Sequence, residues 1–285
     1  MDEEALKEQL TDWERDFFSR DIQLLYKYRG NIYRDLLALK NYQLFIPTKD
    51  GLNDPNESCV SLKRIYEELE YNRRVAVENP IISLKEQAAS LEKQISATTN
   101  ILNMMVDSVG IFSVSKRYDS ECMWSYYANG HKGFCIEYDA KILRNCFKDK
   151  NIFTNNFEVK YSNERMTPDS DEFMLLAKSN PIDTLKGIFA SKSKSWEQEE
   201  EVRYTLQPIK ESQYIDIPDN AVTGIYIGAR CSDFDKNLIL KTIKSMRNCN
   251  IKLYQMKFKE DSFDMDNEEI CLLYTSPSPR DVEES

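Results

Sequence analysis

Short apolar stretches separated by turn-forming residues predict a succession of strands and helices along the chain. Alternating or continuous apolar residues predict strands at residues 23–28, 43–46, 110–115, 133–139, 157–162, 201–207, 214–217, 221–227 and 251–258. Apolar residues three to four apart predict helices at residues 3–20, 32–40, 121–129, 171–193 and 233–246. Several predicted strands follow one another directly. This order predicts an α+β fold with a mixed, largely antiparallel sheet and flanking helices.

A long segment at residues 61–107 has helical spacing and is broken near Asn79-Pro80. Its second half carries Leu84, Leu91 and Ile95 at three-to-four spacing. Because amphipathic helices usually face their own core, we expect a helical hairpin packed on the core, and a partner-binding arm is the alternative. We therefore treat residues 1–270 as a single domain with a helical insertion at 61–107.

Composition and charge narrow the classes of function. The formal net charge is −10, and Lys and Arg are scattered, so no basic face is expected for non-specific binding of duplex phosphate. His131 is the only histidine, so a zinc site would need unusual ligands, and we expect no metal. A Ser-His-Asp catalytic triad or a Cys-His dyad could likewise use only this one histidine.

The ends of the chain predict the cellular compartment of the protein and the C-terminal boundary of its domain. The first ten residues are acidic and polar, unlike a secretory signal, and no run of about 18 apolar residues occurs. The seven cysteines form no Cys-x-x-Cys pair. We therefore expect a cytoplasmic protein with reduced thiols and no membrane segment. Residues 271–281, CLLYTSPSPRD, resemble a translated sequencing adapter from metagenomic assembly, and we exclude residues 271–285 from the domain.

The charged segment at residues 196–203, WEQEEEVR, is the most informative for chemistry. If it forms a strand, Glu199, Glu201 and Arg203 share one face. Two close carboxylates repel, so burial or a nearby cation separates their pKa values, which is typical of acid/base sites. The alternative is a solvated run of charges that opens a strand.

Two further segments carry candidate binding groups. Arg29 stands where a predicted strand meets Gly30, and its guanidinium could hold a phosphate or carboxylate through two parallel hydrogen bonds. Ser113 and Ser115 share one face of a predicted strand, and their hydroxyls can donate and accept. The alternatives are a surface arginine and the polar edge of a half-buried strand.

Aromatic residues gather before His131. Trp124 and Tyr127 lie three apart on a predicted helix, with Tyr126 between them. His131 could serve as a base or as a hydrogen-bond donor. The alternative is that the aromatic residues belong to the core and that the histidine caps a turn.

Six segments in chain order resemble the bacterial family called domain of unknown function 2971: LYKYR, LNDP, FSVSK, MWSYYANGHKGFCIEYD, WEQEEEVRY and IYIGARC. The resemblance covers roughly residues 25–258. Its most specific parts are Met-Trp-x-x-Tyr-Ala-x-x-His-x-Gly-Phe and Trp-x-x-Glu-x-Glu-x-Arg. The segment at 61–107 looks like a variable insertion in this family.

The chain also resembles ADP-ribosyltransferases of the Arg-Ser-Glu type, in which an arginine, a Ser-x-Ser strand and a Glu-x-Glu segment follow in that order. The resemblance implies NAD as substrate. Glu201 would stabilise the positive charge that develops as nicotinamide leaves the ribose, and Glu199 would orient or deprotonate the acceptor. Since no Gly-rich Rossmann fingerprint appears, the dinucleotide would bind by another route.

The same resemblance implies the other roles. Ser113 would brace Glu201, Arg29 would hold the pyrophosphate, and Tyr126 or Tyr127 would stack on nicotinamide. The predicted cofactor-binding set is completed by Ser115, His131 and Arg203.

We therefore expect an ADP-ribosyltransferase-like enzyme that transfers ADP-ribose from NAD to an unknown protein or nucleic-acid acceptor, as a toxin or phage-defence effector. The first alternative is a non-enzymatic binding or regulatory module. Its motif residues would be structural, namely Asn53, Asp54, Trp124, His131, Trp196 and Arg203. The second alternative is a hydrolase of a nucleotide or nucleic acid that uses the glutamate pair and His131; the acidic net charge and the single histidine disfavour it.

Overall fold

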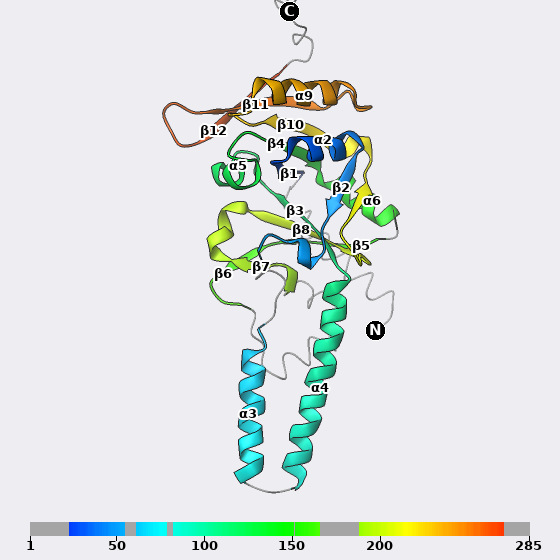
Figure 1. Cartoon of the computed structure of the whole chain (residues 1–285), viewed down its shortest axis with the longest axis vertical. Helices are drawn as coiled ribbons and strands as arrows, with labels where there is room; N and C mark the ends of the chain where they lie inside the picture. Colours follow the sequence, from blue (N-terminus) through cyan, green and yellow to red (C-terminus); the bar gives the residue numbers. More distant parts are fainter. Residues whose placement is uncertain (1–22, 55–60, 79–81, 151, 166–187, 271–285) are drawn as a thin grey trace, which may run out of the picture.

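The fold is built on one large sheet. The computed structural model describes residues 23–54, 61–78, 82–150, 152–165 and 188–270. Among these residues, eight strands form the main sheet in the order β12-β11-β10-β4-β1-β3-β8-β5. Their bounds are β1 (Leu24–Arg29), β3 (Gly110–Ser115), β4 (Phe134–Asp139), β5 (Phe153–Glu158), β8 (Glu201–Gln207), β10 (Val222–Ile227), β11 (Lys252–Phe258) and β12 (Met265–Glu269). Figure 1 shows this sheet with helices around it.

The strand pairing confirms the predicted fold class. Within the main sheet the pair β10 and β11 is parallel, and the other adjacent pairs are antiparallel. Two small sheets add β2 (Gln43–Ile46) against β9 (Gln213–Asp216), and β6 (Lys160–Ser162) against β7 (Ser191–Ser193). The protein therefore has an α+β fold with a mixed, largely antiparallel sheet.

The seam between β1 and β3 is the weakest join described in the main sheet. All six residues of β1 pair with β4, and all six residues of β3 pair with β8. Between β1 and β3, however, only Tyr26 and Ser115 pair among the described residues. The sheet thus consists of two well-paired halves, and the seam between them is where the candidate site lies.

Helices cover the two faces of the sheet differently. The helices α2 (Ile32–Lys40), α6 (Ala140–Asp149) and α9 (Asp233–Lys244) pack on the face that carries Leu25 and Ile136. The short helix α5 (Glu121–Tyr127) packs on the opposite face through Trp124, together with Tyr26 and Tyr28. Each of these helices begins at a side chain that accepts a main-chain N–H, namely Asn31, Ser120, Asp139 or Ser232. Three short 3₁₀ turns complete the elements: η1 (Lys49–Gly51), η2 (Lys194–Glu199) and η3 (Asp219–Ala221).

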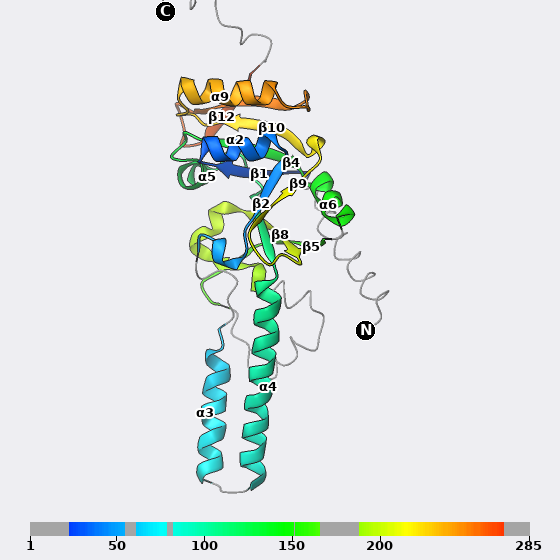
Figure 2. The ribbon, with the colours of Figure 1, turned by 45° about the vertical axis from the view of Figure 1, so that its right-hand side comes forward.

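The helical insertion forms a hairpin of α3 (Lys63–Glu78) and α4 (Ile82–Asp107), and the predicted break at Asn79-Pro80 lies between them, outside the described residues. In Figures 1 and 2 its two helices run side by side away from the sheet. Buried Ile65 and Ile95 belong to a cluster that reaches Ile111 and Phe157 at the base of the hairpin. The expectation of a hairpin packed on the core is therefore wrong for most of its length, since the hairpin packs on itself and meets the sheet only at its base.

Several predicted boundaries need correction. Residues 191–193, predicted as the end of a helix, form β7, and residues 157–162, predicted as one strand, are divided between β5 and β6. Helix α6 and strand β12 were missed. The predicted helix at 3–20, most of the one at 171–193 and the tail at 271–285 lie outside the described residues. Where the chain is described, none of its helices is both long enough and apolar enough to cross a membrane.

Candidate active site

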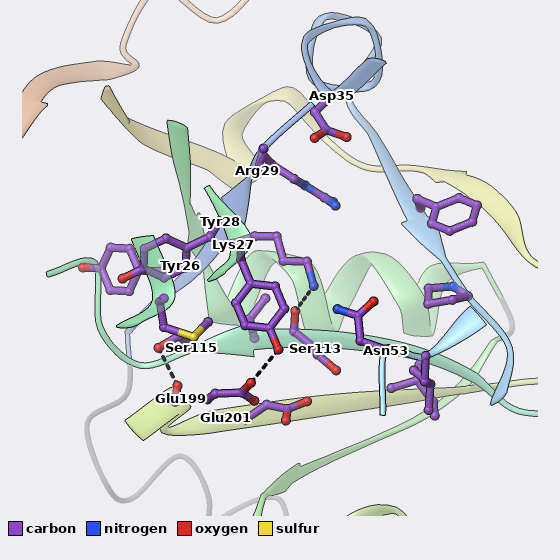
Figure 3. Close-up of a pocket in the computed structure, with 18 of the residues that line it drawn as sticks. Tyr26, Lys27, Tyr28, Arg29, Asp35, Asn53, Ser113, Ser115, Glu199 and Glu201 are labelled. Carbon is purple, nitrogen blue, oxygen red and sulfur yellow. Dashed lines mark hydrogen bonds between the residues drawn. The ribbon is translucent and has the colours of Figure 1, made fainter. Parts of the chain in front are cut away.

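A cavity of about 440 Å³ lies at the seam between β1 and β3. Figure 3 shows its two charged sides. Lys27 and Arg29 of β1 form one side, which we call the basic wall. Glu199 and Glu201 form the opposite side, which we call the carboxylate wall. Other lining residues include Asp35, Asn53, Ser113, Ser115, Tyr127 and Lys192.

The basic wall follows from the alternation along β1. Tyr26 and Tyr28 point to the α5 face, where Tyr28 packs edge-on against Trp124 with the ring centroids 5.2 Å apart. Lys27 and Arg29 must then point to the other face. By the register of β3 and β8, Ser113 and Glu201 belong to the α5 face. The two walls thus start on opposite faces of the sheet, and they meet because the seam carries a single residue pair.

The Lys27 amine is held at the seam. Its Nζ donates a 2.5 Å hydrogen bond to the main-chain oxygen of Ser113 and lies 5.4 Å from the centre of the Phe112 ring. Burial lowers the pKa of Lys27, and the positive charge of Arg29 lowers it further, to about 7. The amine is therefore partly neutral near neutral pH.

The Arg29 guanidinium is the other group of the basic wall. Among the residues that the structure describes, no hydrogen bond or ion pair engages it, and its side chain is only partly buried. In Figure 3 it points into the space between Asp35 and Asn53. A guanidinium in this position can receive a planar or tetrahedral anion through parallel hydrogen bonds.

The carboxylate wall depends on a tight turn. Glu199 ends the 3₁₀ turn η2, Glu200 has a left-handed backbone with φ of 42°, and Glu201 begins β8. The prediction that Glu199, Glu201 and Arg203 repeat along one strand is therefore wrong for Glu199. The turn at Glu200 nevertheless returns the Glu199 side chain to the cavity. Ser115 Oγ secures this turn by donating a 2.8 Å hydrogen bond to the Glu199 carbonyl.

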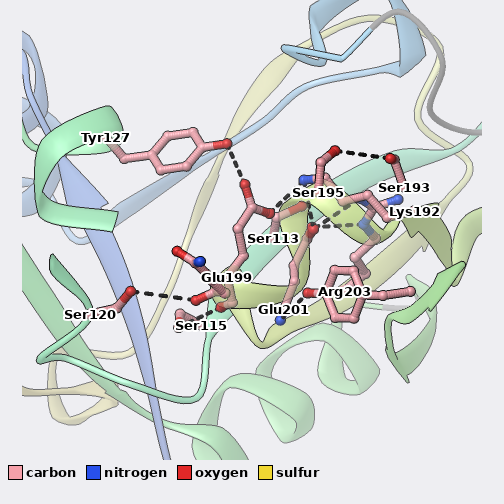
Figure 4. Close-up of polar contacts among 12 residues, drawn as sticks. Ser113, Ser115, Ser120, Tyr127, Lys192, Ser193, Ser195, Glu199, Glu201 and Arg203 are labelled. Carbon is pink, nitrogen blue, oxygen red and sulfur yellow. Dashed lines mark hydrogen bonds and ion pairs between the residues drawn. The ribbon is translucent and has the colours of Figure 1, made fainter. Parts of the chain in front are cut away.

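Glu201 is held by two cations. Arg203 is completely buried and donates from Nε and Nη2 to the two carboxylate oxygens of Glu201, at 2.7 and 2.9 Å. Its Nη1 donates to the Phe189 carbonyl at 2.9 Å. Lys192 Nζ donates to Glu201 Oε2 at 3.2 Å and to Glu199 Oε2 at 2.5 Å (Figure 4). Charges therefore alternate in sign from Glu199 to Arg203.

The two carboxylates have opposite pKa shifts. Burial raises the pKa of Glu199, although Lys192 and the Tyr127 hydroxyl, which donates at 2.6 Å, act against that rise. Burial also acts to raise the pKa of Glu201, but Arg203, Lys192 and a hydrogen bond from Ser113 outweigh it, so the pKa falls well below its ordinary value. Glu201 is thus a fixed anion, and Glu199 is the group that can exchange a proton.

Most of the predicted site residues line the cavity, and three do not. Arg29, Ser113, Ser115, Tyr127, Glu199 and Glu201 line it. Tyr126 is 71% exposed and packs edge-on against Trp196, outside the cavity, so between the two predicted stacking residues only Tyr127 is placed to meet a ligand.

His131 and Arg203 are also outside the cavity. His131 sits in a turn with φ of 67°, where its Nε2 lies 3.2 Å from Ser125 Oγ and its carbonyl accepts from the Arg230 main chain. Arg203 donates hydrogen bonds to Glu201 and to the Phe189 carbonyl and does not line the cavity, so we expect it to act on a ligand through Glu201.

Two of the cavity residues that were missed from the sequence carry amines, Lys27 and Lys192. Lys27 shares a strand face with Arg29 by the same alternation that was applied to Ser113 and Ser115, so a signal was present. Lys192 lies in a segment predicted to be helical, and no spacing in the sequence relates it to the glutamates. In the described part of the chain, no group of three or more His, Cys, Asp or Glu side chains is placed to hold a metal ion.

Comparison with known proteins gives one match. The sequence model of the family described as Protein of unknown function (DUF2971) matches residues 123–204, which span α5, β4 and the turn that carries Glu199 and Glu201. Searches of curated proteins and of solved structures gave no match. The resemblance inferred from the motifs is confirmed in this segment, and the chain carries the signature of the DUF2971 family over residues 123–204.

Proposed function

We propose that this protein is an ADP-ribosyltransferase-like enzyme that cleaves NAD and transfers ADP-ribose to a macromolecular acceptor. The observation that carries the proposal is the convergence of Arg29, Ser113, Glu199 and Glu201 on one cavity. These residues come from distant parts of the chain. They supply a free guanidinium, a hydroxyl and two carboxylates of different acidity.

The separation of charge across the cavity suits this substrate. The pyrophosphate of NAD is anionic and would bind at Arg29 on the basic wall. The ribose becomes positively charged as its bond to nicotinamide breaks, because the transition state resembles an oxocarbenium ion. That charge would develop beside Glu201, which Arg203 and Ser113 hold ionised and in place.

Glu199 has the properties of a general base for the acceptor. Its raised pKa brings proton exchange closer to neutral pH, and Tyr127 and Lys192 fix both of its oxygens. The acceptor nucleophile would lose its proton to Glu199 as it forms a bond to the ribose carbon that nicotinamide leaves. Water in place of the acceptor would yield free ADP-ribose instead.

Labelled NAD tests the proposal. The purified protein is incubated with NAD carrying a label on the adenylate, together with cell protein and nucleic acid. Label should appear on one of these macromolecules and should be lost in Glu201→Gln. Glu200→Gln is the matched control, because this neighbouring carboxylate is outside the cavity and pairs with Arg117. Absence of both label transfer and nicotinamide release from the wild-type protein would refute the proposal.

A binding or regulatory module is the second candidate. Its support is the internal pairing of the completely buried Arg203, which is also what a purely structural ion pair requires. In that case NAD or another anionic ligand binds at Arg29 without turnover, and Glu201→Gln changes stability alone. Calorimetric titration of the wild-type protein with NAD, combined with the assay above, separates the two candidates.

A further inference from the structure

The Lys27 amine has no part in the proposed NAD chemistry, although it lines the same cavity. Its Nζ lies at the seam, where it donates a hydrogen bond to the Ser113 carbonyl and lies close to the Phe112 ring. A lysine that is desolvated beside another cation is the usual form of a nucleophilic amine. Burial and Arg29 lower the pKa of Lys27 to about 7, which is consistent with this form.

Arg29 supplies an anion anchor at a defined spacing. It lies two residues beyond Lys27 on the same face of β1, and two residues of a strand span roughly 7 Å. Its guanidinium has no hydrogen bond or ion pair among the described residues. The cavity therefore presents an amine and a guanidinium from neighbouring positions on one strand face, as capture of a carbonyl and an anion on one short ligand requires.

We propose that the cavity is a capture site for phosphorylated aldehydes, in which Lys27 Nζ forms an imine with the carbonyl carbon while Arg29 binds the phosphate. The capture shares Arg29 with the proposed NAD chemistry, but it needs neither cleavage of nicotinamide nor an acceptor. The ligand class includes open-chain aldose phosphates.

The covalent step needs no other reagent. The neutral amine adds to the aldehyde carbon, a C–N bond forms, and the carbonyl oxygen takes up the proton that nitrogen loses. The resulting carbinolamine then loses its hydroxyl and the second N–H proton as water, which leaves a C=N bond. After protonation the imine has one N–H, which can still donate to the Ser113 carbonyl, and the charges of Glu199 and Glu201 favour this cation as they favour the ammonium.

Reductive trapping tests this site. The full-length protein is incubated at pH 7.5 with ribose 5-phosphate and sodium cyanoborohydride, and intact mass and peptide mapping locate the adduct. We expect one early adduct, on the peptide that contains Lys27, and its absence in Lys27→Gln. Lys252→Met, which removes an exposed lysine of β11, should leave trapping unchanged. Trapping is read by mass in the absence of NAD, so failure of the NAD proposal does not affect this test.

The role of Arg29 as the phosphate anchor is tested separately. Arg29→Met should slow trapping of ribose 5-phosphate about tenfold more than it slows trapping of unphosphorylated ribose, since both sugars lose the effect of Arg29 on the pKa of Lys27 but only the phosphate loses a charge-assisted hydrogen bond. Peptide mapping of the wild-type protein keeps the test decisive even if Lys27→Gln fails to fold. Adducts spread over exposed lysines, with Lys27 modified no faster than Lys252, would overturn the proposal.

Discussion

The basic wall and the carboxylate wall face the same cavity, but their charges are satisfied in different ways. Glu201 receives two hydrogen bonds from Arg203 and one from Lys192, and Glu199 receives hydrogen bonds from Lys192 and Tyr127. On the other wall, Arg29 has no hydrogen bond or ion pair among the described residues. The carboxylate wall is therefore paired within the protein, whereas the Arg29 guanidinium of the basic wall is available to a ligand.

This difference indicates how the two walls share their tasks. Groups that must hold a fixed charge during a reaction need to be organised before the substrate arrives, as Glu201 is. Groups that bind an anion contribute most to its affinity when they have no internal partner that the anion must displace. Substitutions on the carboxylate wall should therefore affect stability and chemistry, and substitutions on the basic wall should affect binding.

Arg203→Met should produce the largest effect. Removing one partner of a buried ion pair leaves the other uncompensated, so the free energy of unfolding should fall by about 3–5 kcal/mol. Arg29→Met is the matched control and should change it by less than about 1 kcal/mol. Urea unfolding monitored by tryptophan fluorescence measures both values, and equal losses in the two variants would contradict the division between the walls.

Glu199→Gln should separate transfer from cleavage. Loss of a general base lowers the rate of ADP-ribose transfer by about 10²-fold to 10⁴-fold, whereas nicotinamide release should fall less because Glu201 is retained. Assays of both products on the same sample give the ratio. A parallel fall in the two rates would show that Glu199 does not act on the acceptor.

Arg29→Met should weaken binding of NAD or ADP-ribose by about 1.5–3 kcal/mol, the contribution of a hydrogen bond to a charged group. Isothermal titration of the inactive Glu201→Gln protein, with and without the second substitution, measures this loss without turnover. Arg74→Met is a suitable control, since Arg74 lies on α3, is not among the residues that line the cavity, and pairs with Glu70. Equal affinity with and without Arg29 would show that the anion does not bind at the basic wall.

Tyr127→Phe should give the smallest effect, on the pH dependence of transfer. The hydroxyl of Tyr127 holds down the pKa of Glu199, so its removal raises that pKa further. Since a base must be ionised, activity rises with pH through the pKa of Glu199, and this rise should move to higher pH in the variant. A shift to lower pH would contradict the assignment of Glu199 as the base.

Elements with a clean local pattern could be predicted from the sequence. Helix α2 and strands β2, β3 and β8 have the predicted bounds, because each is a short segment with a recognisable apolar pattern between turn residues. The helix predicted to end at residue 193 was wrong at its C-terminal end, where residues 191–193 pair with β6 across an intervening stretch of chain. Pairing of this kind leaves no local pattern.

The candidate site was predictable only in part. Arg29, Ser113 and Glu201 stand at strand positions that alternation identifies. The contribution of Lys192 depends on a contact with the glutamates that only folding creates. The left-handed turn at Glu200 could not be predicted either, because no glycine or asparagine stands at that position. Alternation along each strand also gave no indication that Lys27 and Glu201 line the same cavity, because it cannot reveal the gap between β1 and β3.

The single residue pair between β1 and β3 has a mechanical consequence. A molecule that touches both walls passes between the two strands, where a continuous sheet would have its row of main-chain hydrogen bonds. It can enter without breaking such a row, and once bound it bridges the two halves of the sheet. Occupancy should then act as a cross-strand tie, which slows amide hydrogen exchange along β1 and β3 more than along β10 and β11.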